Sequence, residues 1–257
     1  MRIAFWFIGV LVMITSCKGP TDEETIVPIA TTCSNSDFDA DKAWWSNGSL
    51  WLYAGENQPP FDITDWSLDT CQLRFGLGRE YFPAVLTPAY ESIEESETAY
   101  NDDDRFIVVN GGVVKAYSIE LLVKHEVVND TIDDQPIAIG YCVLADLAAV
   151  YYRTYCDSVF TFALSGYTYA DPAVYNNIES FVMWDRETES LWWPLADVGV
   201  SGPMKDVPLE KYLTSKWTEM TFGELKSTHP NAVLLRRDLT VKAPETWKQF
   251  SDAFICK

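Results

Sequence analysis

Basic residues are scarce in this sequence of 257 residues. Lysine and arginine together number 19 against 38 aspartates and glutamates, which gives a formal net charge of −19. Nucleic-acid recognition needs a basic footprint, so we expect no nucleic-acid partner. Anionic lipid headgroups would also repel the chain, so any membrane attachment must come from something other than surface charge.

A hydrophobic run long enough to span a membrane is also missing at the N-terminus. The apolar residues 3–16 fall short of the roughly 20 that a transmembrane helix needs. With Arg2 before them, they have the pattern of a secretory signal peptide. The run ends in Ile14-Thr15-Ser16-Cys17, which resembles the lipobox of bacterial lipoproteins. The alternatives are an ordinary signal peptide and a buried N-terminal helix.

The lipobox resemblance implies cleavage after a signal peptide of residues 1–16 and lipidation of the Cys17 thiol. The partner would then be a membrane, and the location the bacterial cell envelope, on the periplasmic face of a membrane or on the cell surface. More than one acyl chain makes such an anchor stable. The polar residues 17–36 predict a flexible tether, and residues 37–257 a single β-rich domain.

Paired cysteine motifs are missing as well. Of the six cysteines, none lies in a C-x-x-C or zinc-finger spacing. An oxidising compartment permits disulfides. Because an odd number of cysteines remains once Cys17 is set aside, at least one thiol stays unpaired or pairs between chains. The remaining cysteines are Cys33, Cys71, Cys142, Cys156 and Cys256.

No complete catalytic motif is present. The sequence has neither a G-x-S-x-G nucleophile elbow nor a P-loop. The segment HEVVND begins like the zinc motif H-E-x-x-H, but Asn129 stands where the second histidine belongs. The acidic residues 91–104 lack EF-hand spacing and predict a solvated helix and loop. The sequence therefore favours a non-enzymatic protein with no evident cofactor.

Hydrophobic patterning predicts a mainly β fold of the α+β class, an antiparallel sheet or barrel-like meander with a few short helices. Asn47-Gly48 and Asn110-Gly111-Gly112 are typical of hairpin turns. A helical stripe begins at Ile119 and includes Val127, and Asn129-Asp130 predicts its end. The remaining predicted strands cover residues 136–143, 147–153 and 158–164, with at least one more strand and a charged turn within 180–193 and a final strand within 231–237. Helices are predicted over 221–228 and 244–254.

Five segments, in order, resemble the bacterial and archaeal domain of unknown function 3179 over about residues 78–238. They are YFPAVLTPAY, VVKAYSIELLVKHEVVNDTIDDQPIAIGYC, FALSGY, VMWDRETESLWWPL and MTFGELKSTHPNAVLL. The family motif reads Cys-Pro-Leu-Cys-Gly-Thr-Ala, and some relatives carry selenocysteine there, which implies redox chemistry. Here Cys142 is present, but Ala145 stands at the second cysteine. A dithiol site needs two sulfurs in reach, so the resemblance implies a degenerate one-cysteine site.

Cys142 is the first candidate site residue. By the two-residue period of a strand, Ala138, Gly140 and Cys142 share one face, with Ile137, Ile139, Tyr141 and Val143 on the other. Such a small-residue face suits a shielded thiol, with His125 and Glu126 as catalytic neighbours, or a metal ion beside Cys142 and His125. It equally suits a tightly packed core, with His125 and Glu126 bonded to the turn at residues 129–134.

If the three runs from residue 136 to 164 form a meander, Cys142 and Cys156 lie at opposite ends of the middle strand. About seven residues at 3.3 Å separate those ends by roughly 20–25 Å, whereas a disulfide needs Cα atoms within about 7 Å. We therefore expect no Cys142–Cys156 disulfide. The third strand would return Ser165, Gly166 and Tyr167 to the Cys142 end, as candidate ligand-binding residues.

Asp185 and Arg186 are further ligand-binding candidates, because an arginine can bind a carboxylate or phosphate. They also suit a charged β-turn held by an ion pair. The sequence thus predicts a lipid-anchored cell-envelope protein, with a degenerate thiol-redox or metal-associated site. The alternative is a non-catalytic envelope lipoprotein that binds a ligand or a protein.

Overall fold

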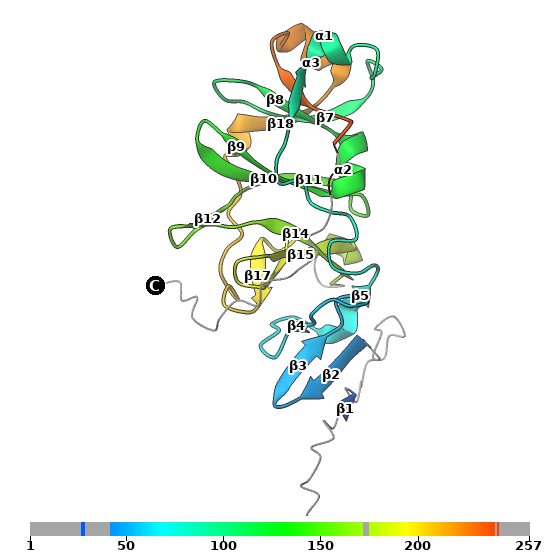
Figure 1. The fold of residues 1–257 in the computed structure, drawn as a ribbon, viewed down its shortest axis with the longest axis vertical. Coiled ribbons are helices and arrows are strands. Elements are labelled where there is room, and N and C mark those ends of the chain that lie inside the picture. The colour runs from blue at the N-terminus through cyan, green and yellow to red at the C-terminus, as the bar shows by residue number, and fades with distance from the viewer. Residues whose placement is uncertain (1–26, 29–41, 172–174, 240, 242–257) are drawn as a thin grey trace, which may run out of the picture.

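The structure, a computed structural model, describes residues 27–28, 42–171, 175–239 and 241. Four β-sheets are stacked along the long axis of the molecule (Figure 1). We number them 1 to 4 from the N-terminal end of the stack. The predicted signal peptide, Cys17, Cys33, Cys256 and the predicted C-terminal helix lie outside the described residues, and so does the predicted tether apart from Val27–Pro28.

The strands are short, and most neighbours in sequence also pair. Among the described strands every pair is antiparallel except β8 with β19. Sheet 1 has the order β1-β2-β3-β4 (Val27–Pro28, Ala43–Ser46, Ser49–Leu52, Phe61–Asp62). Sheet 2 has the order β17-β16-β15-β14-β5 (Val198–Ser201, Leu191–Trp193, Ser180–Asp185, Phe162–Tyr169, Leu73–Phe75). Sheet 3 is β11-β10-β9 (Leu147–Tyr152, Gln135–Cys142, Val127–Ile132). Sheet 4 is β18-β7-β8-β19-β6 (Trp217–Thr221, Arg105–Val109, Lys115–Ser118, Val233–Leu235, Tyr90–Ser92).

The helices are few and lie at sheet edges and ends. They are α1 (Ile93–Ser96), α2 (Ile119–His125) and α3 (Phe222–Thr228), with 3₁₀ turns at Thr70–Gln72, Tyr175–Asn177 and Thr214–Lys216. A small hairpin joins β12 (Thr154–Tyr155) to β13 (Ser158–Val159). The mainly β prediction is confirmed, and the described strands form open sheets rather than a closed barrel. None of the described helices is long and apolar enough to cross a membrane.

Sheet 3 is the middle layer between sheets 2 and 4, and it buries both faces (Figure 1). Its Ile137, Ile139 and Tyr141 belong to the core shared with sheet 4 and α2. Ala138 and Cys142 belong to the core shared with sheet 2. The predicted division of β10 into a large-residue and a small-residue face is therefore confirmed. The small face lets the Phe181 ring of β15 approach, since a Cβ on Gly140 would lie 3.7 Å from Phe181 Cζ.

Both hairpin predictions are confirmed. Asn47 and Gly48 have positive φ and join β2 to β3, and the turn from Asn110 joins β7 to β8. The helix over 222–228 and the acidic helix at 93–96 also form. Each begins with a capping box, Thr221 with Glu224 and Ser92 with Glu95. Val27–Pro28, inside the predicted tether, pair with β2 as strand β1.

The prediction that the 119–127 stripe is one helix ending at Asn129-Asp130 is wrong. Helix α2 ends at His125, because Glu126 adopts φ 56° and ψ −27° in the left-handed region. Val127 already belongs to β9, and the turn falls instead at Asp133 and Asp134, both with positive φ. Asn129 can lie within a buried strand because its amide bonds to backbone groups, with Nδ2 donating to Phe162 O at 2.8 Å.

The predicted meander of three runs is also wrong in its third member. Strands β10 and β11 pair as expected, with Cys142 opposite Leu147. Strand β14, however, pairs with β15 and β5 in sheet 2, and β9 takes the free side of β10. The local pattern of β14 is that of a buried strand, which does not specify the neighbour to which it bonds.

Candidate functional site

The three cysteines that the structure describes divide into two chemical states. Cys71 and Cys156 are each disulfide-bonded, whereas Cys142 is a free thiol and is buried. The expectation that Cys142 and Cys156 do not pair is therefore confirmed.

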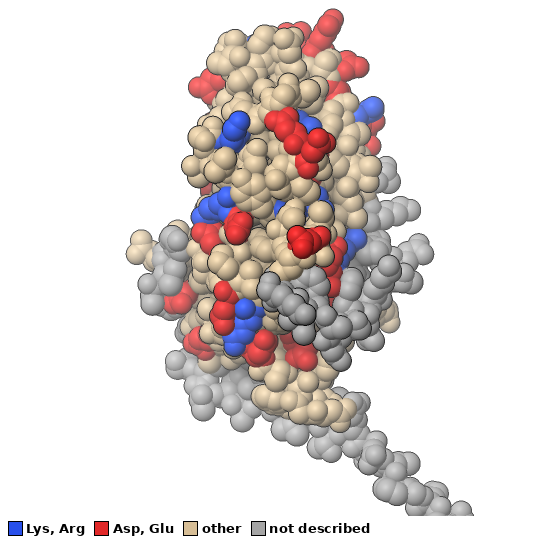
Figure 2. Space-filling view, turned by 90° about the vertical axis from the view of Figure 1, so that its left-hand side faces the viewer, with Lys and Arg blue, Asp and Glu red and all other residues tan. Residues whose placement is uncertain are grey.

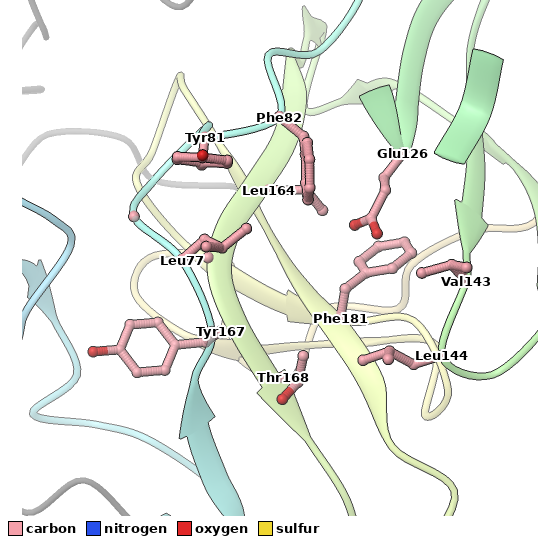
Figure 3. Close-up of a pocket in the computed structure, with 13 residues that line it drawn as sticks. Leu77, Tyr81, Phe82, Glu126, Val143, Leu144, Leu164, Tyr167, Thr168 and Phe181 are labelled. Carbon is pink, nitrogen blue, oxygen red and sulfur yellow. The ribbon is translucent and has the colours of Figure 1, made fainter. Parts of the chain in front are cut away.

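A cavity of about 200 Å³ opens beside the β10–β11 turn, where sheets 2 and 3 meet the irregular chain of residues 76–82 (Figure 3). Its wall is mostly apolar. The rim residues Leu77, Tyr81, Val143 and Leu144 are exposed, with Tyr81 66% and Leu144 58% accessible. The lining residues are Gly76, Leu77, Gly78, Tyr81, Phe82, Glu126, Val143, Leu144, Leu164, Gly166, Tyr167, Thr168 and Phe181.

Glu126 is the one acidic or basic residue among those lining this cavity. Its position follows from the end of α2, where its backbone N–H bonds Leu122 O and its own carbonyl accepts from Tyr141 N–H of β10. The carboxylate lies among apolar side chains and points toward the Phe181 ring (Figure 3). It makes no hydrogen bond or ion pair with another described residue, and only 7% of the residue is exposed. This burial raises the pKa of Glu126 to about 7.

Cys142 lies behind the cavity wall rather than in it, between Tyr141 and the lining residue Val143. Its Sγ accepts the backbone N–H of Phe181 at 3.4 Å. Burial raises the pKa of the Cys142 thiol, and the negative charge of Glu126 adds to the effect. The N–H groups of Phe181, Ala145 and Leu144 act in the opposite direction without reversing it. The thiol is therefore held neutral and shielded.

His125 turns toward another segment. Its Nδ1 lies 2.8 Å from the carbonyl oxygen of Pro83. Because a carbonyl oxygen only accepts, Nδ1 carries the proton in this bond. The contact holds the end of α2 against residues 83–85, where Val85 also exchanges backbone bonds with Val127 and Asn129. Of the pair His125–Glu126, it is the glutamate that enters the cavity.

Ser165, Gly166 and Tyr167 form a bulge in β14, where the register with β15 shifts between Leu164 and Tyr167. Gly166 and Tyr167 line the cavity, although the three-stranded meander from which they were predicted does not form. Ser165 is fully buried; its Oγ donates to Val182 O at 2.6 Å and accepts from Tyr167 N–H. The serine thus supports the bulge, while Tyr167 directs its hydroxyl away from the cavity to Tyr53 O.

Asp185 and Arg186 begin the turn between β15 and β16, and neither lines the cavity. Asp185 accepts from Thr188 and from Trp192 Nε1, and burial raises its pKa to about 7. Arg186 bonds the buried carboxylate of Glu80 through two nitrogens. The geometry is that of a charged turn held by internal bonds.

Among the described residues no group of three or more His, Cys, Asp or Glu side chains is arranged to hold a metal ion. On the face shown in Figure 2, basic side chains lie singly or in small groups among acidic ones.

Sequence reasoning missed most of the cavity wall. Leu77, Tyr81, Phe82, Leu164 and Phe181 come from three separate segments, and nothing local marks them as a group. The one available signal is Tyr81-Phe82 before Pro83, two adjacent aromatic residues in the YFPAVLTPAY segment of the family resemblance. Glu126 was identified, but as a partner of the thiol rather than as the polar group of a cavity.

Comparison with known proteins gives one match. A family model described as a protein of unknown function (DUF3179) matches residues 79–252. No curated protein and no solved structure matches the chain. The matched region contains much of the cavity, including Glu126 on α2, the β10–β11 turn and the bulge in β14. Since it spans more than half of the sequence and agrees with the motifs quoted above, the chain belongs to the DUF3179 family.

Proposed function

We propose that this protein is a lipid-anchored cell-envelope protein that binds a small, largely apolar ligand in the cavity beside the β10–β11 turn. The observation that carries the proposal is the exposed apolar rim that leads inward to one buried carboxylate. Small-molecule sites are typically concave and apolar, with a few polar groups that orient the ligand.

The rim supports the ligand-binding proposal because its exposed apolar side chains contribute little to the stability of the fold. Leu77, Tyr81, Val143 and Leu144 are all large and exposed around one opening. Contiguous exposed apolar patches are uncommon on soluble proteins and tend to mark interaction sites. A ligand in the cavity would cover these side chains and the walls formed by Phe82, Leu164 and Phe181.

The state of Cys142 favours binding over thiol chemistry. A nucleophilic cysteine needs access and a depressed pKa, whereas the Cys142 thiol is buried and its pKa is raised. The position of the family's second cysteine is Ala145, so no resolving sulfur stands beside it. We assign Cys142 a packing role at the junction of sheets 2 and 3.

The envelope location is supported by two separate features. Arg2, the apolar residues 3–16 and the Ile14-Thr15-Ser16-Cys17 segment fit a lipoprotein signal. The disulfide-bonded state of Cys71 and Cys156 fits an oxidising compartment. Metabolic labelling with a fatty-acid analogue in a bacterial host tests the anchor: the wild type should take the label and Cys17→Ala should not. Equal labelling would contradict the proposal.

The ligand-binding proposal is tested with 1-hexanol, a neutral probe small enough for the cavity, by isothermal titration calorimetry. Leu144→Trp should fill the opening and weaken binding by about tenfold or more. Leu213→Trp is the matched control, because Leu213 is similarly exposed, at 55%, and is not a lining residue. Absence of binding to the wild type, or equal loss in both variants, would contradict the proposal.

A further inference from the structure

We infer that the cavity selects ligands that carry a protonated amine on an apolar body, and that Glu126 is the anion that receives the amine. This inference rests on the proposed ligand-binding function and adds the chemical class of the ligand.

The first argument is charge compensation. Only 7% of the surface of Glu126 is exposed, and its carboxylate has no ion-pair partner among the described residues. None of the other lining residues is acidic or basic. A buried carboxylate without a partner is unfavourable, and a cation or hydrogen-bond donor placed beside it relieves the cost. An ammonium group supplies both the charge and the donors.

The second argument is the aromatic surroundings. The Phe82 and Phe181 rings line the same cavity as Glu126, whose carboxylate points toward Phe181, and the exposed Tyr81 also lines it (Figure 3). A cation over an aromatic face is attracted by the ring quadrupole, and more strongly where water is excluded. A carboxylate at the end of an aromatic-walled cavity therefore favours a cationic head over a neutral one.

The third argument excludes the anionic alternative. A fatty-acid carboxylate would bring a second negative charge beside Glu126, and like charges in a shared site oppose each other. The net charge of −19 also lowers the local concentration of anions and raises that of cations. The apolar lining residues Leu77, Val143, Leu144 and Leu164 then suit the hydrocarbon part of the ligand.

The experiment compares three probes with the same six-carbon chain, hexylammonium, 1-hexanol and hexanoate, by isothermal titration calorimetry. At about pH 8, where Glu126 is mostly ionised, hexylammonium should bind at least about tenfold more tightly than 1-hexanol. Hexanoate should bind more weakly than either. Equal binding of hexylammonium and 1-hexanol, or a preference for hexanoate, would overturn the amine inference while the ligand-binding function stands. Absence of binding by all three would overturn the function itself.

Two variants test whether Glu126 is responsible for the preference for hexylammonium. Glu126→Gln should remove the preference for hexylammonium, so that its affinity falls to within about twofold of the affinity of the same variant for 1-hexanol. Glu94→Gln is the matched control, since Glu94 is exposed on α1 and is not a lining residue. An unchanged preference in Glu126→Gln would overturn the assignment to this residue.

A measurement on the wild type alone keeps the inference testable if Glu126→Gln does not fold. An ammonium beside Glu126 stabilises the ionised carboxylate, so near pH 7 binding should release protons. The heat of hexylammonium binding should then differ between phosphate and Tris buffers, which differ in ionisation enthalpy. Cys142 is a further titratable neighbour of Glu126, and its thiol remains neutral in this range because its pKa is raised. Buffer-independent heats would overturn the ion pair.

Discussion

The backbone N–H of Phe181 donates to the Sγ of Cys142 at 3.4 Å and so joins β15 of sheet 2 to β10 of sheet 3. The Phe181 ring lines the cavity beside Glu126. A single contact thus connects the packing of the free cysteine with the wall of the proposed ligand site. The same contact shields the sulfur, since Cys142 is almost fully buried.

The Cys142 thiol should react slowly with a maleimide reagent in the folded protein, because burial and the charge of Glu126 raise its pKa. In denaturant without reductant, Cys142 should be labelled rapidly, while Cys71 and Cys156 should not, since both are disulfide-bonded. Peptide mapping by mass spectrometry distinguishes the three sites. Rapid labelling of Cys142 in the folded protein near pH 7 would instead support a thiol site.

Replacing the buried carboxylate should change the pH dependence of stability. The folded pKa of Glu126, about 7, lies above its unfolded value, so the folded state holds an extra proton between about pH 4.5 and 7. Stability from this group is therefore present at low pH and is lost as pH rises through 7. Relative to the wild type, Glu126→Gln should gain unfolding free energy between about pH 5 and 8, by up to roughly 3 kcal/mol.

Chemical denaturation at both pH values measures this difference. Glu94→Gln serves as the control and should show no such gain, because Glu94 is exposed. A constant difference between Glu126→Gln and the wild type at the two pH values would show that Glu126 does not titrate in this range.

Removing the Asn129 side chain should destabilise the junction of sheets 2 and 3. Its Oδ1 accepts from Phe162 N–H at 2.9 Å and its Nδ2 donates to Phe162 O at 2.8 Å, so the amide takes the place of a paired strand. Asn129→Ala leaves both buried backbone groups without partners and should cost about 2–5 kcal/mol of unfolding free energy. Asn101→Ala, at an exposed position, should change stability by less than about 0.5 kcal/mol. Similar losses in both variants would contradict this role.

Gly166→Ala should be far more damaging than Gly48→Ala, although the two glycines have similar φ angles of 87° and 84°. An alanine Cβ at position 166 would lie 2.0 Å from Leu77 O, whereas nothing lies within 4 Å of one at position 48. Both variants bear the strain of positive φ, about 1–2 kcal/mol. The overlap should make Gly166→Ala at least about 2 kcal/mol more costly in thermal or chemical unfolding. It should also weaken 1-hexanol binding, because Gly166 lines the cavity.

Much of the fold follows from local patterns. The Asn47-Gly48 turn, the Asn110-Gly111-Gly112 turn and the alternation along β10 each depend on residues within a few positions of one another. The end of α2 did not follow, because the apolar stripe continued through Val127. Glu126 ends the helix there in a left-handed conformation, which its side chain does not signal.

The candidate site was less predictable than the fold. The sequence identified Glu126, Gly166 and Tyr167 as neighbours of Cys142, and all three line the cavity next to it. It could not show that Cys142 lies behind the wall, or that His125 turns to Pro83. Those outcomes depend on how residues 76–85 pass across two sheets, and an irregular segment carries no period from which its contacts can be derived.

By itself, the sequence determined the strand-rich class, the hairpin turns, the two faces of β10 and the membership of the family. The tertiary structure decided which sheet received β14, and that two sheets and an irregular segment enclose an apolar cavity. It also decided that Glu126 is buried there without a partner among the described residues. The physical reason is the separation along the sequence over which each interaction acts. Turn chemistry and residue period act over a few positions, whereas the pKa of Glu126 is set by apolar groups more than thirty positions away, such as Phe82 and Leu164.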